Sequence, residues 1–409
     1  METTSWPTHW LDRRQFVGTL LTAAGTGAVL DAPATSVISG EANLNVYERI
    51  GVQPLVNAAG ILTMLGGSLM LKEVKAAMEE ASRHYVNLRE LHEAAGALIA
   101  RRIGVEAALV TSGAAAALLI GTAACVTKGD PERIRRIPDT SGMPNEVIVQ
   151  RAHRHHFDHA IRSAGVRFVE VETREELDKA FSSKTAMMHF LVYADKKGRI
   201  GMEEWIDIGK KRGIPNFLDA AADIPPAGNL RKYTDMGFDL VAFSGGKALR
   251  GPQCSGLLLG RKDLVEAAFL NDSPFPDSIG RGCKVGKEEI IGLLTAVELF
   301  LKRDHAADWK RWQAIIADWE AELHKVRGIT LERIGPENAG NVPYLSLNWD
   351  QSARGFSHED FLNRLREGRP RIELWDTRDR GLCLTPFMLE PGEEKIVIRR
   401  VVEVFKSFS

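Results

Sequence analysis

Between residues 106 and 244, short apolar segments alternate with longer segments whose apolar residues recur at three- and four-residue spacing. The short segments have the length of β-strands and the longer ones the periodicity of helices; the predicted strands are EAALVT, EVIVQ, VRFVEV, TAMMHFLVY, IPNFLDA and FDLVAF. Strands that are separated by helices pair in parallel, and the helices cover both faces of the sheet. The alternation therefore predicts an α/β fold with a mainly parallel central sheet, whose ligands bind beyond the carboxyl ends of the strands.

The segments on either side of this alternation predict the domain organisation. A chain of 409 residues is too long for one small core. Residues 35–70 are glycine-rich and uneven in pattern, which predicts an extended N-terminal arm, and residues 71–306 form the predicted large domain. Beyond residue 306, a Trp-rich helical segment leads into shorter strands and helices. We therefore expect a smaller C-terminal α+β domain over residues 307–409.

The first 34 residues have the composition of an export signal. Arg13 and Arg14 precede Phe16, an uncharged stretch covers residues 15–30, and small residues follow at Ala32 and Ala34. Paired arginines before a short apolar stretch resemble a twin-arginine signal, which predicts an exported, periplasmic protein handled by the twin-arginine export machinery. The alternative is a disordered basic tail or an uncleaved amphipathic helix on a cytoplasmic protein.

Charge and cysteine content bear on whether the chain binds nucleic acid, binds zinc or forms disulfides. The chain has 53 basic and 54 acidic side chains, so no overall basic charge predicts binding to nucleic acid. The four cysteines, Cys125, Cys254, Cys283 and Cys383, show no CxxC spacing. They predict neither a zinc site nor a disulfide framework.

Lys247 lies in a short bent segment, FSGGKALRGPQCSG, directly after a predicted strand. The segment is not a phosphate-binding P-loop, because Ala248 follows the lysine and position 242 is alanine. A lysine shielded at a strand end has a lowered pKa and can form a Schiff base, and Ser244 could bind a phosphate nearby. The alternative is a turn with a solvated lysine.

Two other strand ends carry polar residues. Ser112 and Gly113 separate a strand from a helix of small residues, so the helix N-terminus could bind a phosphate, or Ser112 could simply cap the helix. Asp219 ends the strand NFLD, where a carboxylate could pair with a protonated ring nitrogen or could cap a turn. Each of these features, taken alone, leaves both interpretations open.

The stretch HRHHFDH contains four histidines and Asp158. It is close to the HxHxDH motif of two-metal hydrolases but has one extra residue, and a helix starting there would scatter the side chains around its axis. We therefore expect no metal site, and a metal-dependent hydrolase using residues 153–159 is the distant alternative. Some of these histidines are expected to be solvated. Near a cofactor ring, one of them could stack on it: His153 is the first candidate, and His155 or His156 the second.

The segments VNAAGILTMLGGSLM, VTSGAAAAL, LDAAAD and FSGGKALRGPQCSG resemble the selenocysteine synthase-like branch of the fold-type I pyridoxal phosphate (PLP) enzymes. That branch includes L-seryl-tRNA selenium transferases and D-glucosaminate-6-phosphate ammonia-lyases. The order of the features, a phosphate turn, a histidine, Asp219 and then Ser-x-x-Lys, is also that of this fold. The resemblance runs from about Val46 to the C-terminus, and it implies an aspartate aminotransferase-like fold with PLP as the cofactor.

The resemblance also implies roles for individual residues. Lys247 would be the Schiff-base lysine and Asp219 the partner of the ring nitrogen. The remaining cofactor-binding residues would be Ser112, Gly113, Ala114, His153, His155, Ala221 and Ser244. The family fold implies a homodimer, or a larger even oligomer, whose active sites are built from both chains, with Lys284 and Lys287 as cross-subunit contributors.

The implied reaction is that of a PLP-dependent lyase on a small amino acid. Lys247 would remove the Cα proton, and β-elimination would release ammonia and a 2-oxo acid. Arg250 and Arg371 are candidates for holding the substrate carboxylate. An aminotransferase and an amino-acid racemase are alternatives. The balanced charge and the predicted export disfavour selenium chemistry on tRNA, and export also disfavours a phosphorylated sugar acid as the substrate.

Overall fold

The computed structural model describes residues 45–335, 341–377 and 379–408. The chain divides into two compact units, Met1–Pro54 and Leu55–Ser409. The described part of the first unit contains one short 3-10 helix, η1 (Glu48–Ile50). The predicted export signal, residues 1–34, and residues 35–44 of the predicted arm lie outside the described residues. Within the described ranges, no helix combines the length and the apolar character that crossing a membrane requires.

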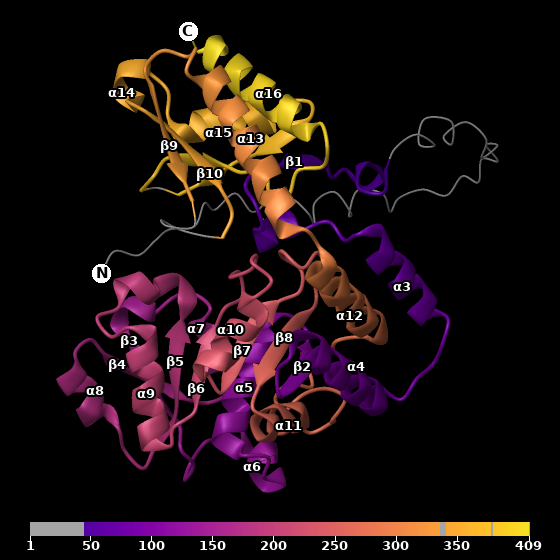
Figure 1. Ribbon diagram of the computed structural model, residues 1–409, viewed down its shortest axis with the longest axis vertical. Helices are drawn as coiled ribbons and strands as arrows, with labels where there is room; N and C mark the ends of the chain where they lie inside the picture. The colour runs from indigo at the N-terminus through magenta and orange to yellow at the C-terminus, as the bar shows by residue number, and fades with distance from the viewer. Residues whose placement is uncertain (1–44, 336–340, 378, 409) are drawn as a thin grey trace, which may run out of the picture. The chain divides into compact units, whose positions relative to one another are not determined.

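A seven-stranded sheet forms the centre of the second unit (Figure 1). Its strands, in spatial order, are β2 (Ala107–Thr111), β8 (Gly256–Gly260), β7 (Leu240–Ser244), β6 (Asn216–Asp219), β5 (Thr185–Leu191), β3 (Glu146–Gln150) and β4 (Arg167–Val171). β8 runs antiparallel to both its neighbours, whereas the pairs from β7 to β4 are parallel. The predicted mainly parallel α/β sheet is confirmed. β8 is an additional strand that the sequence pattern did not predict.

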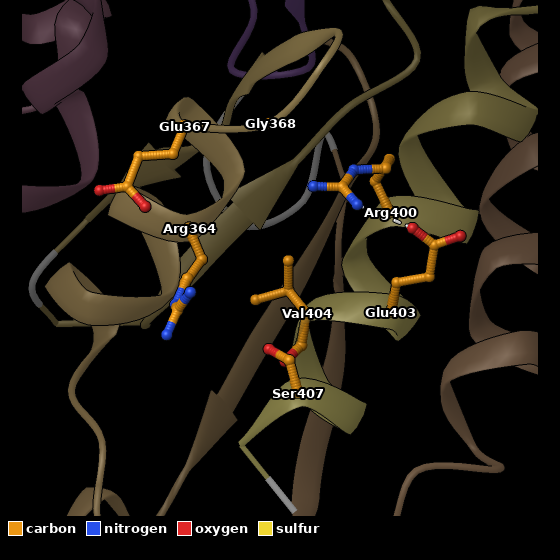
Figure 2. A pocket seen from close by; sticks show the side chains of 7 residues that line it. All are labelled: Arg364, Glu367, Gly368, Arg400, Glu403, Val404 and Ser407. Atoms are coloured by element: carbon orange, nitrogen blue, oxygen red, sulfur yellow. Dashed lines mark hydrogen bonds and ion pairs between the residues drawn. The ribbon is translucent and has the colours of Figure 1, made fainter.

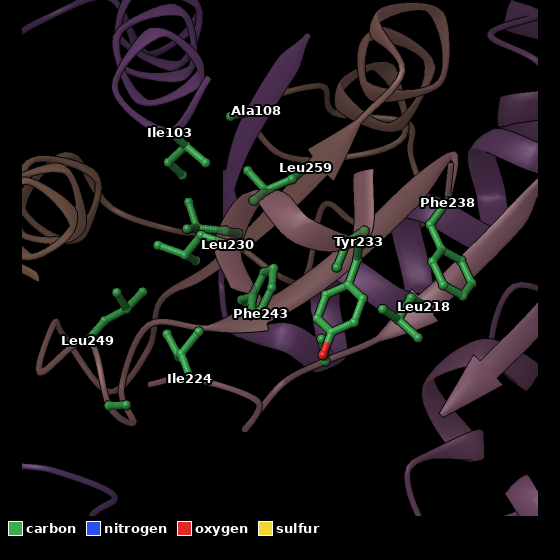
Figure 3. Packing of buried hydrophobic residues seen from close by; sticks show 14 of the residues in the cluster. Ile103, Ala108, Leu218, Ile224, Leu230, Tyr233, Phe238, Phe243, Leu249 and Leu259 are labelled. Carbon is green, nitrogen blue, oxygen red and sulfur yellow. The ribbon is translucent and has the colours of Figure 1, made fainter. Parts of the chain in front are cut away.

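Helices cover both faces of this sheet because its buried strands present apolar side chains to both sides. In β6, Leu218 packs into one core with helices α4 (Leu88–Ile103), α9 (Met202–Arg212), α10 (Asn229–Met236) and α12 (Lys287–Lys302). Its neighbour Phe217 packs into a second core with α5 (Ala114–Thr127) and α11 (Lys262–Leu270). Figure 3 shows the first core, where Leu218, Phe243 and Leu259 of the sheet lie beside Leu230 and Tyr233 of α10.

The helices up to residue 302 are α3 (Lys72–Ser82), α4 (Leu88–Ile103), α5 (Ala114–Thr127), α6 (Pro131–Arg136), α7 (Asp158–Arg162), α8 (Arg174–Ala180), α9 (Met202–Arg212), α10 (Asn229–Met236), α11 (Lys262–Leu270) and α12 (Lys287–Lys302), with 3-10 turns η2 (Thr63–Leu65), η3 (Arg151–His153) and η4 (Val192–Lys197). Several of these helices begin at side-chain caps that the sequence supplies, such as Asn87 before α4 and the capping box of Thr173 and Glu176 at α8.

The C-terminal part of the chain contains a second sheet, in the order β12-β13-β10-β9. Its elements are α13 (His305–Leu323), β9 (Ile329–Ile334), β10 (Tyr344–Trp349), α14 (Gln351–Arg354), α15 (His358–Arg366), β11 (Arg371–Glu373), β12 (Trp375–Asp376), β13 (Leu382–Leu384) and α16 (Glu393–Ser407). A third core contains Trp319, Phe361 and Phe405. β1 (Leu55–Asn57) pairs in parallel with β11. The boundary between a large and a small domain at residue 306 stays a prediction.

Candidate active site

The strands β2, β6 and β7 run in the same direction, so three of the predicted strand-end residues lie at one edge of the central sheet. Asp219 ends β6, Ser244 ends the adjacent strand β7, and Ser112 follows β2. β8 lies between β7 and β2, and its first residue, Gly256, is paired with both Ser244 and Thr111. The structure therefore places the phosphate turn, the acid and the lysine segment at the same edge of the sheet.

The segment 245–253, here called the lysine loop, folds back on itself. Gly245 donates to the Ser255 carbonyl (2.8 Å), Gly251 donates to the Gly245 carbonyl (3.0 Å), and Arg250 donates to the Lys247 carbonyl (2.9 Å). Side chains at Gly245 and Gly246 would collide with Ser255 and Gln253, and this close packing explains the glycine pair. The loop leaves Lys247 as a mostly buried lysine beyond the end of β7.

Lys247 is held in a shielded position next to one acid. Burial lowers the pKa of its ammonium, and the Asp219 carboxylate opposes this shift. Among the described residues, none accepts a hydrogen bond from Lys247 Nζ. A lysine that is shielded, unpaired and lowered in pKa has a larger fraction in the neutral amine form than a solvated lysine has. The neutral amine can act as a nucleophile or as a base.

The lysine loop is covered by residues 66–69 of the arm. Ser68 Oγ donates to the Gly246 carbonyl (3.1 Å), and Arg250 Nε donates to the Leu69 carbonyl (2.7 Å). The side-chain amide of Gln253 is oriented so that its nitrogen faces two carbonyls, and it donates to those of Gly66 (2.9 Å) and Gly246 (3.1 Å). Gln253 therefore joins the arm to the lysine loop.

Asp219 is a buried carboxylate with a defined orientation. Its Oδ1 accepts a hydrogen bond from the Ala221 N–H (3.0 Å), and the Ala221 carbonyl accepts one from the Ser244 N–H (3.3 Å). Burial raises the pKa of Asp219, while the Ala221 N–H, His155 and Lys247 oppose the rise. A buried carboxylate of this kind is suited to pairing with a cationic group that enters the site.

The phosphate turn, Ser112 to Ala114, has a shape that only small residues permit. Gly113 has φ +92°, in the left-handed region, and its carbonyl accepts a hydrogen bond from Thr111 Oγ1 (2.9 Å). A Cβ on Gly256 would lie 2.5 Å from the Gly113 carbonyl carbon and 2.8 Å from the Ala114 nitrogen. Helix α5 begins at Ala114, so the amides of its first turn have no partner within the helix and can bind an anion.

The structure separates the two leading histidine candidates. His153 is fully buried: its Nδ1 accepts from the Leu191 N–H (3.2 Å), its ring packs edge-on against Phe190, and burial lowers its pKa to about 4. No described contact joins His153 to Asp219. His155, in contrast, places Nε2 3.9 Å from Asp219 Oδ2. The geometry therefore favours His155 as the histidine beside the cofactor ring, and the stacking role stays a prediction.

The remaining histidines of this stretch do not converge on a metal. His156 and His159 are exposed, and His153 faces the apolar core. A different trio, His155, Asp158 and His189, has ligand atoms within 4.8 Å of one another. His189 was not among the predicted site residues, and Asp158 was included only in the alternative of a metal-dependent hydrolase using residues 153–159. His189 could have been recognised as a lone histidine inside the apolar strand TAMMHFLVY, and Asp158 lies within the histidine stretch itself.

The two arginine candidates are both engaged in ion pairs. Besides its bond to Leu69, Arg250 donates from Nη2 to Glu390 (2.8 Å). Arg371 donates to Glu373 (3.0 Å), which also accepts from Arg366, and no described contact joins Arg371 to Lys247 or Asp219. Of the lysine candidates, Lys284 is exposed, whereas Lys287 donates to the Ala81 carbonyl (2.8 Å). The substrate-binding and cross-subunit roles stay predictions.

A separate surface pocket lies in the C-terminal part of the chain, between α15 and α16 (Figure 2). Its volume is about 320 Å³, and it is lined by Arg364, Glu367, Gly368, Arg400, Glu403, Val404 and Ser407. Its opposite charges partly neutralise each other, because Arg400 pairs with Glu403 (2.8 Å). None of the predicted site residues lines this pocket.

The residues at the sheet edge fit PLP. An unpaired buried lysine can hold an aldehyde covalently, a buried carboxylate can pair with a protonated pyridine nitrogen, and the open first turn of α5 can bind a phosphate. The buried Nε2 of His155, which has no hydrogen-bond partner, lies next to the carboxylate. Each group that binding of this cofactor requires is therefore present at one edge of the sheet.

Comparisons with known proteins agree with this fit. The family model described as L-seryl-tRNA selenium transferase matches residues 55–327. A 5'-C-glycyluridine monooxygenase-decarboxylase of Streptomyces is 33% identical, with 88% of this chain and 91% of the relative covered. The D-glucosaminate-6-phosphate ammonia lyase of Salmonella typhimurium is 29% identical over 88% of this chain and 98% of the relative.

Solved structures give the same result for the fold. The structure of D-glucosaminate-6-phosphate ammonia-lyase matches with a TM-score of 0.77 and 28% identity, covering 89% of this chain and 99% of that one. A serine palmitoyltransferase from S. paucimobilis, solved with a PLP adduct, matches with a TM-score of 0.56 and 14% identity over 87% of this chain and 88% of that one, which shows the fold alone. The predicted fold type and the predicted cofactor are confirmed. The chain therefore belongs to the L-seryl-tRNA selenium transferase family of fold-type I, PLP-dependent enzymes.

Proposed function

We propose that this enzyme is a PLP-dependent ammonia lyase that acts on a small amino acid by Cα deprotonation and β-elimination. The observation that carries the proposal is the position of Lys247, a shielded and unpaired lysine, beside the buried carboxylate of Asp219 at the end of adjacent parallel strands. The similarity to D-glucosaminate-6-phosphate ammonia lyase supports elimination with release of ammonia.

When bound, PLP would supply an electron sink for the electron pair left at Cα. Lys247 would hold the cofactor and, once displaced by the substrate amine, would accept the Cα proton on Nζ. Its lowered pKa favours the neutral amine that this step requires. Asp219 would keep the ring nitrogen protonated, and the first turn of α5 with Ser112, Gly113 and Ala114 would hold the phosphate, together with Ser244.

Substrate binding would require a cation for the carboxylate and an exit for the β-leaving group. Arg250 lies in the lysine loop itself, which supports it over Arg371 for the first role. Loss of the β-leaving group gives an enamine, which water converts to ammonia and a 2-oxo acid. Water is thus the co-reactant in this sequence, and no oxidant is required.

Assembly and export are part of the same proposal. Exposed apolar side chains lie on the arm and on the connection between α3 and α4, namely Met64, Leu69, Tyr85 and Val86. Their exposure supports a second copy of the chain as the partner in a homodimer. Arg13-Arg14 and the uncharged stretch after them support export by the twin-arginine route.

A second candidate function is oxidative decarboxylation of an amino acid. A relative named for this kind of reaction, the glycyluridine monooxygenase-decarboxylase, is 33% identical to this chain, compared with 29% for the ammonia lyase. Oxygen consumption and release of carbon dioxide would identify this reaction. An aminotransferase would instead require an added 2-oxo acid, and a racemase would return only the D-amino acid.

The test starts with the absorbance spectrum of purified protein supplied with PLP. We expect a band near ~420 nm that borohydride removes, and its loss in Lys247→Ala. Lys262→Ala, at an exposed lysine that begins α11, is the matched control and should keep the band. A panel of amino acids is then assayed for ammonia and 2-oxo acid. A cofactor-supplied protein without the band, or a band that survives in Lys247→Ala, would overturn the proposal.

A further inference from the structure

Two buried polar side chains, Asp158 and His189, and the partly buried His155 lie close together, and His155 contacts Asp219. His155 follows η3, Asp158 begins α7, and His189 lies in β5. Four of their polar atoms, His155 Nε2, Asp158 Oδ1 and both ring nitrogens of His189, are buried without a hydrogen-bond partner. Because leaving a buried polar atom without a partner costs about 1–3 kcal/mol, so many such atoms together indicate a functional rather than a purely structural arrangement.

The backbone determines which nitrogen of His155 carries the proton. The Phe157 N–H donates to His155 Nδ1 (3.2 Å), so Nδ1 uses its lone pair as an acceptor. In the neutral ring the proton is then on Nε2. Nε2 lies 3.6 Å from Asp158 Oδ1 and 3.9 Å from Asp219 Oδ2. The ring N–H therefore lies between two buried carboxylates.

Asp158 is held in place independently of the His155 ring. Its Oδ2 accepts from the His155 backbone N–H (3.2 Å) and from Arg154 Nε. Arg154 is fixed in turn by an ion pair with Glu170 and by stacking over the Phe168 ring at 4.3 Å. Oδ1 of Asp158 has no other partner among the described residues and remains available to the imidazole.

We propose that Asp158 is a positioning residue that holds the His155 ring, with its proton on Nε2, against Asp219. This inference rests on the proposed function, in which Asp219 pairs with the ring nitrogen of the cofactor. The His155 ring, held by Asp158, would orient the Asp219 carboxylate for that pairing. Asp158 itself touches neither substrate nor cofactor; it acts through His155. No bond is made or broken in this arrangement.

The charges around His155 come from few groups. Asp158 of α7, Asp219 of β6 and His189 of β5 face the ring, and His153 and Arg154 act from its own segment. Burial lowers the pKa of His153 to about 4 and that of His189 to about 3, so both are neutral at pH 7.

Asp158→Asn tests the proposal with little change of shape. The asparagine oxygen can keep the contacts that Oδ2 makes with the His155 backbone and Arg154. The NH₂ group then takes the place of Oδ1, so that a donor instead of an acceptor faces the ring N–H of His155. We expect PLP binding, followed by absorbance titration, to weaken about tenfold. The pH at which the visible band changes should fall by about half a unit to one unit, because a negative charge near the cationic cofactor is lost.

The matched control is Glu170→Gln, which removes the other carboxylate bound to Arg154 but no group that faces His155. It should change both quantities much less than Asp158→Asn does, because the Phe168 ring still holds Arg154. In a His155→Phe background, Asp158→Asn should not weaken PLP binding further, since the proposed effect on affinity passes through the imidazole. An equal loss of affinity in that background, or an equal effect of Glu170→Gln, overturns the proposal.

Wild-type protein without cofactor provides a measurement that needs no variant. Nitrogen-15 spectra of labelled histidine should show the His155 ring protonated on Nε2 with Nδ1 bare; the opposite tautomer overturns the proposal. So does a stoichiometric divalent metal in the purified protein, because His155, Asp158 and His189 would then be its ligands. If wild type gives no visible band, the proposed function fails; if it gives the band and Asp158→Asn behaves as wild type, only the role of Asp158 fails.

Discussion

Gly256 is the residue whose substitution most directly tests the phosphate turn. It begins β8, the second strand from one edge of the sheet, and is paired with both Thr111 and Ser244. In Gly256→Ala the new Cβ would lie 2.5 Å from the Gly113 carbonyl carbon and 2.8 Å from the Ala114 nitrogen, well inside contact distance. Overpacking of this kind costs about 1–3 kcal/mol. If the turn moves to relieve the contact, PLP binding weakens by roughly 5- to 150-fold.

The assay is a PLP titration of the cofactor-free protein, with the thermal midpoint measured alongside. Gly201→Ala is the matched control, because Gly201 has φ −68° and open space around its Cβ position. We expect the control to bind PLP as wild type does. A folded Gly256→Ala protein that binds PLP with wild-type affinity would refute the assignment of residues 112–114 as the phosphate site.

Three further predictions concern other parts of the molecule. Burial lowers the pKa of His92 to about 4 and that of His189 to about 3, so the unfolded chain binds more protons below pH ~6.5. The contribution of these two histidines to the free energy of unfolding of the cofactor-free protein is therefore complete above that pH and falls as the pH drops toward 4. In urea denaturation at pH 7 and pH 5, His92→Phe should flatten this slope by up to about 1.4 kcal/mol per pH unit, and an unchanged slope would contradict the buried neutral state. Arg250→Gln removes the bond to the Leu69 carbonyl and the ion pair with Glu390, so limited proteolysis should cut the arm near residues 66–69 faster; an unchanged cleavage rate would mean that Arg250 does not hold the arm. Trp319→Phe loses the bond from Nε1 to the Glu394 carbonyl (2.9 Å) and removes part of a buried side chain from the C-terminal core. It should destabilise the protein by about 1–3 kcal/mol in urea denaturation, and an unchanged free energy of unfolding would contradict this role of Trp319.

Much of the large sheet could be predicted from sequence because its strands are short apolar runs between helices of clear periodicity. β8 was missed because GLLLG follows a glycine- and proline-rich loop and runs antiparallel, outside the strand–helix alternation. Its position depends on Gly256 packing against Gly113, a contact between segments far apart in the chain. Periodicity within one segment carries no information about such a contact.

The candidate site, like the sheet, could be predicted from the sequence only in part. Asp219, Ser244 and Lys247 could be identified because each follows a recognisable strand. The choice among the histidines could not, since His153 and His155 differ by two positions and only the fold directs one to the apolar core and the other to Asp219. Asp158 and the arm residues that cover the lysine loop are likewise defined by tertiary contacts.

The arm that covers the lysine loop affects the order in which the site can form. Ser68 and Gly246 are separated by 178 residues, and Leu69 and Arg250 by 181. Closing so long a loop costs about 2.5 kcal/mol more than closing one of ten residues, so these contacts gain little until the intervening sheet has already brought their ends together. During synthesis the arm emerges well before its partner segment. A protein cut within the arm would therefore keep its sheet and its buried acid, while the segment that carries Lys247 would lose the cover that fixes its shape.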